Sequence, residues 1–155
     1  MRHAKSDWSA DYPVDHERPL NPRGVRSARA IGEALTARGL DPDLVITSSA
    51  VRARTTAELA RDAGSWRGAI VLEPRLYDAD PSVVIEVAAS APDVDRLMLV
   101  GHQPTWSATV HALTAHVVDM KTATVAVIEV AIDEWAHLPG GSGNLVQVLH
   151  PRRSR

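Results

Sequence analysis

The sequence predicts an α/β protein in which helices cover both faces of a mostly parallel sheet, a three-layer α/β/α sandwich. Short apolar runs of the kind found in buried parallel strands alternate along the chain with segments of helical period. Strands that alternate with helices pack as a parallel sheet. Two further apolar segments near the C-terminus, separated by a Pro- and Gly-rich turn, predict an antiparallel element.

The first half of the chain begins with a polar, Pro-containing stretch at 5–23. Apolar residues then recur at helical spacing until Gly39, which predicts a helix starting near Gly24. The apolar run 44–47 is typical of a buried strand, and 51–63 follows as a second helix that ends at a glycine.

The second half of the chain continues the alternation. The apolar and helix-period patterns predict, in order, a strand at 69–72, a helix at 81–89, a strand at 96–100, a helix at about 105–114, and closing strands at 122–132 and 144–149. No repeat or linker interrupts this order. With 155 residues, 45% of them apolar, the chain can bury one sizeable core, so 1–155 is expected to form a single domain.

Composition limits the classes of partner. The net charge is −2, and the 17 basic residues are spread along the chain, so we expect no nucleic-acid partner. The longest apolar runs are too short to span a bilayer, and the N-terminus lacks a signal-peptide pattern. The absence of cysteine fits a reducing compartment. We therefore expect a soluble cytoplasmic protein with no membrane partner.

Two histidines and two arginines fall where predicted strands end. His102 follows the strand at 96–100, Arg52 lies just after the strand at 44–47, and Arg2 and His3 stand at the start of the chain. Ligands of open α/β sheets bind outside the carboxyl ends of the strands. We expect these four side chains to meet in one crevice.

The strand that should carry Arg2 and His3 is missing from this sequence. Only Met1 precedes them, whereas a strand normally has about five or six residues. We expect a first strand that is truncated, or a start codon placed at an internal methionine.

Four segments in order resemble the histidine phosphatase superfamily, whose fold is that of the phosphoglycerate mutases, and they are closest to its short phosphohistidine phosphatase branch. The segments are RHAKS (2–6), DHERPLNPRG (15–24), SSAVRARTT (48–56) and GHQP (101–104). Ser49 stands where the branch has proline and Gln103 where it has asparagine, positions that shape turns rather than react. The resemblance covers nearly the whole chain and implies a histidine phosphatase.

The resemblance implies a catalytic set whose chemistry follows from the residue types. Neutral imidazole is a nucleophile near neutral pH, so His3 would attack phosphorus and form a phosphohistidine. Arginine forks match phosphoryl oxygens, which gives that role to Arg2 and Arg52. His102, if protonated, would be a third donor. This chemistry needs no metal, and we expect no cofactor.

A general acid for the leaving group is expected between Arg52 and His102. Larger members of the superfamily use a glutamate in this interval, and the candidates here are Glu73, Asp78 and Asp80, of which we favour Asp78.

Three further residues are candidates for substrate binding. They are Ser6, Arg18 and Gln103. Arg18 could instead hold the loop after His3 through an ion pair with Asp15, and we favour this supporting role. Trp106 could belong either to the core or to a substrate wall.

The short loops indicate the substrate. Only about twenty residues separate His3 from the first predicted helix, and long loops are where specificity lids would be expected. An open, shallow site suits a phosphohistidine on a protein surface, and the resemblance implies this substrate. One alternative is a small phosphorylated metabolite, such as a sugar phosphate, in an apolar-walled pocket. The other is a non-catalytic phosphate-binding module, which would gain weight if His3 had no fixed place.

Overall fold

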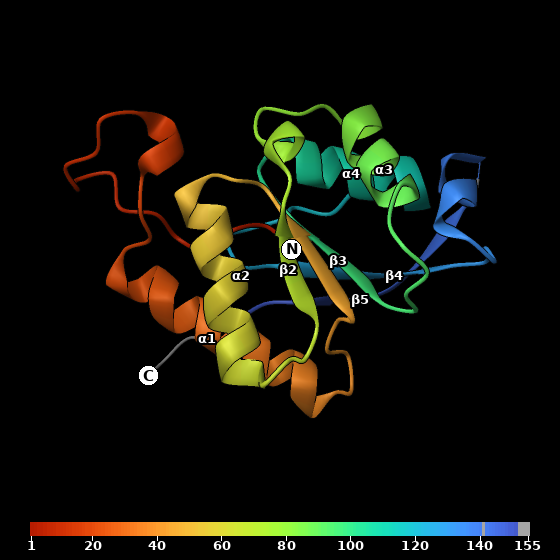
Figure 1. Ribbon diagram of the computed structural model, residues 1–155, viewed down its shortest axis with the longest axis horizontal. Helices are drawn as coiled ribbons and strands as arrows, with labels where there is room; N and C mark the ends of the chain where they lie inside the picture. Colours follow the sequence, from red (N-terminus) through yellow and green to blue (C-terminus); the bar gives the residue numbers. More distant parts are fainter. Residues whose placement is uncertain (141, 152–155) are drawn as a thin grey trace.

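A parallel sheet of three short strands forms the centre of the protein. A computed structural model of the chain describes residues 1–140 and 142–151. The strands are β1 (Leu44–Thr47), β2 (Ala69–Leu72) and β3 (Leu97–Val100), in the order β2-β1-β3 (Figure 1). Both pairs are parallel, which confirms the predicted strands and their direction.

Helices lie on both faces of this sheet. One face carries α1 (Pro22–Ala37) and α2 (Val51–Gly64), which pack on each other. The other face carries α3 (Pro81–Ala89) and α4 (Thr105–Thr114). Figure 1 shows the two helix pairs on opposite sides of the strands. The predicted three-layer arrangement is confirmed.

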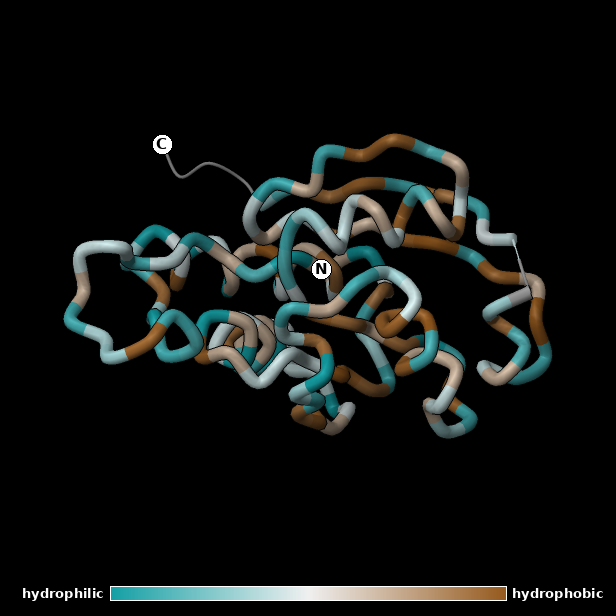
Figure 2. Tube along the Cα trace, turned by 90° about the horizontal axis from the view of Figure 1, so that it is seen from above, coloured by the Kyte–Doolittle hydropathy of each residue, from teal (hydrophilic) through white to brown (hydrophobic). Residues whose placement is uncertain are grey.

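The strands bury both faces, and successive residues belong to different cores. Val45 and Val100 pack with the apolar residues of α1 and α2. Leu44, Ile46 and Leu99 pack with the apolar residues of α3 and α4. Figure 2 shows apolar stretches running through the middle of the molecule around the N-terminus. This two-sided burial explains why the strands are continuous apolar runs rather than alternating ones.

Helix α1 begins two residues earlier than its apolar pattern suggested, because a cap defines its start. The Asn21 side chain accepts a hydrogen bond from the Gly24 backbone at 2.8 Å, and Pro22 occupies the first turn. A Cβ on Gly24 would lie 2.0 Å from the Lys5 carbonyl oxygen. Glycine therefore allows the loop after His3 to lie directly against the start of α1.

The C-terminal strands form a separate antiparallel pair. They are β4 (Val125–Val130) and β5 (Gly143–Leu149), with a register irregularity between Val127 and Ile128. The predicted pair is confirmed, although β4 is shorter than the apolar run 122–132. Three short 3-10 helices were not predicted: η1 (Asp15–Glu17), η2 (Pro74–Leu76) and η3 (Trp135–Gly140).

The first residues of the chain lie between β3 and β4. The Arg2 backbone donates to the Thr124 carbonyl and the His3 backbone donates to the Gly101 carbonyl, each at 3.0 Å. Arg2 and Gly101 form a single parallel bridge. The expected first strand is thus reduced to one bridge, but this bridge fixes Arg2 and His3 at the carboxyl end of β3.

Within the described residues, no helix is both long and apolar enough to cross a membrane.

Candidate active site

His3 presents one ring nitrogen to the site and uses the other to hold its orientation. Its Nδ1 lies 2.6 Å from the Ala4 carbonyl oxygen. A carbonyl can only accept, so Nδ1 carries the proton and Nε2 keeps its lone pair. The residue is 6% exposed, and burial, followed by the charges of neighbouring groups, lowers its pKa to about 3. At neutral pH His3 is a neutral, oriented imidazole.

His102 lies against His3 in a partly buried position that disfavours a charged ring. The two ring centroids are 5.3 Å apart, and His102 Nε2 lies 2.8 Å from Ser48 Oγ. Burial, and then the charge of Arg52, lower the pKa of His102 to about 4. His102 is therefore neutral at pH 7, because a charged ring would be desolvated beside an arginine. The protonated form that the sequence analysis considered is disfavoured here.

The two arginines reach the histidines from different elements. Arg52 lies in the first turn of α2, directly after β1, and is 6% exposed. Arg2 Nη1 donates to the Met120 carbonyl at 3.1 Å. Both guanidiniums, together with His102, lower the pKa of His3 through their charges. The structure thus brings together the four residues expected from the sequence.

Three buried side-chain nitrogens of this cluster have no hydrogen-bond partner among the described residues. They are Arg2 Nε, Arg52 Nε and His102 Nδ1. A buried N–H group without a partner costs about 1 to 3 kcal/mol, so natural proteins seldom leave one unpaired without a reason. Three such atoms beside one nucleophilic nitrogen are suited to hold an anion.

The carboxylate of Asp15 occupies the outer donors of the arginines. Arg52 Nη2 donates to Asp15 Oδ2 at 3.0 Å, Arg18 Nη1 donates to Oδ1, and the Tyr77 hydroxyl donates to Oδ2 at 2.7 Å. Arg52 Nη1 also donates to the Asp15 carbonyl at 2.8 Å. Partial burial acts to raise the pKa of Asp15, but the Tyr77 hydrogen bond and the charges of Arg52 and Arg18 hold it at about 2. A fixed anion therefore lies where phosphoryl oxygens would compete for the same guanidiniums.

Arg18 and Ser6 support this arrangement. Arg18 is 4% exposed, donates from Nε to Ser6 Oγ at 3.0 Å, and forms the ion pair with Asp15 that the sequence offered as its alternative role. Its guanidinium also lies 3.6 Å from the ring centroid of Trp8. Ser6 is buried behind Arg18. Direct contact of either residue with a substrate stays a prediction.

A cavity of about 310 Å³ opens beside the cluster. Its lining includes Arg52, His102, Tyr77, Asp78 and Asp15. Asp78 lines this cavity, is exposed and adopts a left-handed backbone with φ 58°. Its role as a general acid stays a prediction.

The other acidic candidates have different partners. Glu73 pairs with Arg75 at 3.0 Å, and Asp80 caps the start of α3. The Gln103 side chain is bonded at both of its polar atoms to Ser107, although Gln103 also lines the cavity. Its substrate-binding role stays a prediction.

Trp106 belongs to the core rather than to a substrate wall. It is 5% exposed among the apolar residues between the sheet and α3 and α4. A Cβ on Gly101 would lie 2.0 Å from its ring. Gly101 therefore lets Trp106 pack directly behind the backbone that holds His3.

Sequence reasoning missed several residues of the site. The Tyr77 ring lies edge-on to both His16 and His102. His16 Nε2 lies 2.9 Å from Ser49 Oγ. Ser48 contacts His102 through its hydroxyl. Asp15 was considered only as a partner of Arg18. For Ser48 and Ser49, the one signal available in the sequence was their position directly after β1.

The short loops led us to expect an open site, but the site is partly closed. His3 and Arg52 are buried, and η1 brings Asp15 across the arginines. The side chain of Asp15 is itself 48% exposed, so it can move into solvent. His3 has a fixed place in the fold, which argues against a non-catalytic module.

Comparisons with known proteins agree with this geometry. Residues 1–82 match the family model of the histidine phosphatase superfamily (branch 1). An uncharacterised protein of Mycobacterium tuberculosis is 39% identical over 98% of this chain and 100% of its own length. The structure of a protein assigned as a phosphohistidine phosphatase, SixA, from Nakamurella multipartitia is 29% identical, with a TM-score of 0.84 over 97% of this chain and 93% of that chain.

A more distant structure shares the fold alone. It is a mycobacterial glucosyl-3-phosphoglycerate phosphatase, 19% identical, with a TM-score of 0.66 over 94% of this chain and 95% of that chain. Together with the family match and the relative, these findings show that the chain is a phosphatase and belongs to the histidine phosphatase superfamily.

Proposed function

We propose that the protein is a protein phosphohistidine phosphatase that works through a phosphohistidine on His3 and needs no metal. The observation that carries the mechanism is the hydrogen bond from His3 Nδ1 to the Ala4 carbonyl, because it leaves the Nε2 lone pair free inside a pocket of unpaired cationic and neutral donors. Imidazole of this tautomer attacks phosphorus without a separate base.

The reaction has two steps. In the first, His3 Nε2 forms a bond to phosphorus while the bond from phosphorus to the substrate nitrogen breaks. In the second, water attacks the phosphohistidine, which releases inorganic phosphate and restores His3. Arg2 and Arg52 hold the phosphoryl oxygens in both steps, and His102 donates from its neutral ring. The removal of one such donor costs on the order of a hundredfold or more in rate.

A phosphohistidine substrate depends less on a general acid than a phosphate ester does. At neutral pH Asp15 is ionised, because its pKa is held at about 2, and Asp78 lines the cavity and is exposed. An alkoxide needs a proton in the transition state, whereas a phosphohistidine protonated on its free ring nitrogen releases neutral imidazole without one. The similarity to SixA from Nakamurella multipartitia supports the same choice.

Trapping of the phosphoenzyme tests this proposal. Protein is mixed with a radiolabelled phosphohistidine protein, and in parallel with a panel of labelled sugar phosphates, then quenched in alkaline detergent because phosphoramidates hydrolyse in acid. We expect label on the wild-type chain first from the phosphohistidine protein, with no effect of chelator. We expect none on His3→Ala and normal labelling of His111→Ala, since His111 is an exposed residue of α4 outside the site.

Two outcomes would contradict the proposal. Undiminished turnover by His3→Ala would exclude His3 as the nucleophile. Faster labelling by the sugar phosphates would assign the protein to small-molecule phosphomonoesterases. The cavity of about 310 Å³ beside Tyr77 favours this second function, since it reaches the lower end of the volumes usual for small-molecule pockets.

A further inference from the structure

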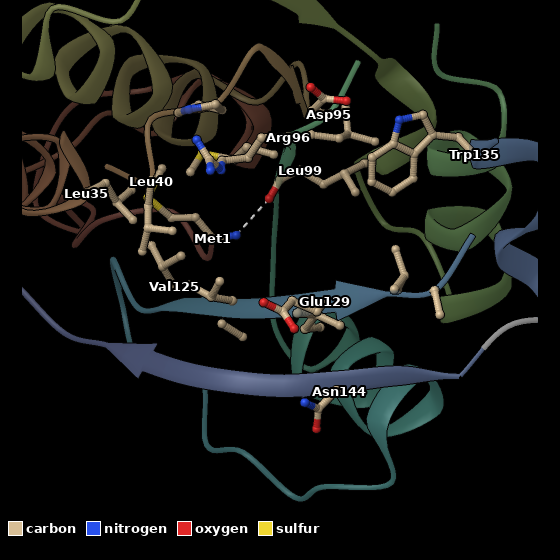
Figure 3. A pocket seen from close by; sticks show the side chains of 18 of the residues that line it. Met1, Leu35, Leu40, Asp95, Arg96, Leu99, Val125, Glu129, Trp135 and Asn144 are labelled. Atoms are coloured by element: carbon tan, nitrogen blue, oxygen red, sulfur yellow. Dashed lines mark hydrogen bonds between the residues drawn. The ribbon is translucent and has the colours of Figure 1, made fainter. Parts of the chain in front are cut away.

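The surface that meets a substrate lies on the side of the smaller cavity. A larger cavity, of about 630 Å³, lies between β3 and β4, and Figure 3 shows it with Met1 and Trp135 among the side chains around it. Its lining includes none of the four residues of the catalytic cluster. The cavity of about 310 Å³ is lined by Arg52, His102 and Asp15. A phosphoryl group that reaches the cluster through this cavity passes beside the segment that carries Asp15.

This segment, residues 7–19, is a closed surface loop. The Asp7 N–H donates to the Pro19 carbonyl at 2.8 Å, and an antiparallel bridge pairs Ser6 with Leu20 at its base. Figure 1 shows the loop projecting from the body of the molecule at the red end of the chain. Compact loops whose ends are joined in this way are frequently functional. We call residues 7–19 the 7–19 loop.

The 7–19 loop is fastened to the active site. Asp15 is bonded to Arg52, and His16 Nε2 lies 2.9 Å from Ser49 Oγ. The place of the loop relative to the catalytic cluster is therefore set before a substrate arrives. A binding surface that is already ordered loses less conformational entropy on binding than a flexible one.

The 7–19 loop presents apolar side chains to solvent. Trp8 is 72% exposed and Val14 is 57% exposed, with the half-buried Tyr12 between them in the sequence. The Arg18 guanidinium lies 3.6 Å from the ring centroid of Trp8, so it orients the ring and leaves most of it open. Tryptophan is among the side chains that contribute most to protein interfaces. Trp8 and Val14 are suited to contact an apolar side chain of a partner.

The exposed charge of the loop is negative. Residues 7–17 contain four carboxylates and no lysine or arginine. One of them, Asp15, is paired with arginines. The other three, Asp7, Asp11 and Glu17, form no ion pair within residues 1–140 and 142–151. Such carboxylates repel a free anion and attract a partner that carries basic residues.

The depth of the charges distinguishes two kinds of substrate. Arg52 is 6% exposed and has an unpartnered Nε, which suits a phosphoryl group, whereas the loop beside it is acidic and apolar. A free phosphorylated metabolite brings only negative charge to this loop, which repels it. A phosphohistidine on a protein also brings its neighbouring residues, which can be basic and apolar.

We propose that the 7–19 loop is the docking surface for the protein substrate, and that it selects a phosphohistidine flanked by basic and aliphatic residues. Trp8 and Val14 contact the aliphatic side chain. Asp11 and Glu17 attract the basic ones. This inference rests on the proposed function, since it names which phosphohistidine proteins the site accepts.

Two peptides and one small substrate test this proposal. Both peptides have a phosphohistidine with leucines nearby, and the residues on each side of the phosphohistidine are lysine in one and glutamate in the other. Phosphoramidate is the small substrate, because it has no flanking residues to contact the loop. We expect kcat/KM of the wild type to be at least about tenfold higher for the lysine peptide, and this preference to shrink as salt is added.

Two variants separate the apolar and the charged parts of the loop. We expect Trp8→Ala to lower kcat/KM for the lysine peptide by at least about tenfold more than for phosphoramidate, through a higher KM. We expect Asp11→Lys to narrow the ratio between the two peptides by at least about threefold.

Each variant has a matched control. Val146→Ala removes an exposed apolar side chain from β5, and Asp93→Lys reverses an exposed carboxylate that precedes β3, at the end opposite to the site. Asp93→Lys changes the net charge by the same amount as Asp11→Lys. We expect both controls to keep the wild-type ratios.

Binding without turnover is the second measurement. The lysine peptide with an unphosphorylated histidine is titrated into isotopically labelled protein and followed by nuclear magnetic resonance. We expect shifts in the amide signals of residues 7–17 and in the Trp8 indole signal, and much smaller shifts with the glutamate peptide. If these shifts occur but the phosphorylated peptides are not hydrolysed, the proposed function fails and the docking surface stands.

Three results would overturn the docking surface. The first is equal kcat/KM for the two peptides together with equal shifts. The second is a loss in Trp8→Ala that is as large for phosphoramidate as for the lysine peptide, because Trp8 would then act only through Arg18. The third is a dimer that buries Trp8 in the absence of peptide, which would assign the loop to a second copy of the chain.

Discussion

At the scale of single residues, Asp15 is the group that competes with a bound anion for the arginines of the site. It is bonded to Arg52 and Arg18, the first of which the proposed mechanism assigns to the phosphoryl group. A carboxylate and a phosphate cannot both occupy the same guanidinium donors. A phosphate that takes the Nη donors of Arg52 therefore has to displace Asp15.

We expect Asp15→Asn to bind inorganic phosphate about tenfold more tightly, because a neutral amide competes less well than a carboxylate for guanidinium donors. Isothermal titration of wild type and variant measures this. Glu17→Gln is the matched control, since Glu17 is an exposed carboxylate of the same turn. Weaker phosphate binding by Asp15→Asn would show that the carboxylate positions the arginines instead.

The residues of the site differ in how far the sequence revealed them. Arg52 and His102 could be found because each follows a predicted strand, and His3 because it lies in a segment, 2–6, that resembles a motif of the family. Asp15 could not be recognised as an anion within the site, because its contact with Arg52 spans 37 positions of chain and depends on the path of a loop. The neutral state of His102 depends on burial, which no local pattern encodes.

At the scale of elements, the end of β3 and the start of α4 are coupled through Gly101. A Cβ there would lie 2.0 Å from the Trp106 ring, and the Gly101 carbonyl holds the His3 backbone. We expect Gly101→Ala to lower the free energy of unfolding by about 1 to 3 kcal/mol through overpacking, and to lower phosphatase activity by displacing His3. Urea denaturation and steady-state kinetics measure the two effects.

The contact with Trp106 can be isolated by a double variant. In Gly101→Ala with Trp106→Phe, the smaller ring makes room for the methyl group, so the two losses of stability should sum to more than the loss in the double variant. If the two losses of stability simply add, the strain in Gly101→Ala does not come from contact with the Trp106 ring.

Helices and strands were predictable to the extent that their burial is periodic. The strands β1 and β2 and helix α3 have the predicted bounds, because apolar runs and a Pro at the first helical position define them locally. Helix α1 starts earlier because the Asn21 cap, rather than the apolar pattern, sets its first turn. The 3-10 helices have no periodic burial, which leaves no pattern to detect.

At the scale of the whole molecule, three buried groups link stability to pH. Burial is the main cause that lowers the pKa of the Met1 amine from 8.0 to about 5, of His102 from 6.5 to about 4, and of His3 from 6.5 to about 3. Over these intervals the unfolded chain binds protons that the folded protein does not, so stability rises with pH.

We expect the free energy of unfolding to fall as the pH is lowered from 8 to 4. The slope is at most about 1.4 kcal/mol per pH unit for each proton, and it is steepest between about 6.5 and 5, where all three groups contribute. The stability that Asp15 contributes is lost only when the pH falls below 3.8, the ordinary pKa of its carboxyl group. Urea denaturation across this range measures the slope, and a flat profile between pH 6.5 and 5 would contradict the burial of the histidines.

The layered architecture was predictable from the alternation of elements, but the cavity of about 630 Å³ between β3 and β4 was not. The pattern of apolar residues shows where a strand lies. It cannot show that β4 stays apart from β3 at a distance that leaves a cavity, because the two are separated by α4 and a long loop.

The stacking of Arg18 on Trp8 gives the protein an optical reporter. Trp8 is 72% exposed, whereas Trp66 and Trp106 are buried, so a change in the surroundings of Arg18 alters one emitter and leaves those two unchanged. When an anion displaces Asp15 from Arg18, the ring under that guanidinium experiences a different electric field. Occupancy of the site can then be followed by intrinsic fluorescence, without a labelled substrate.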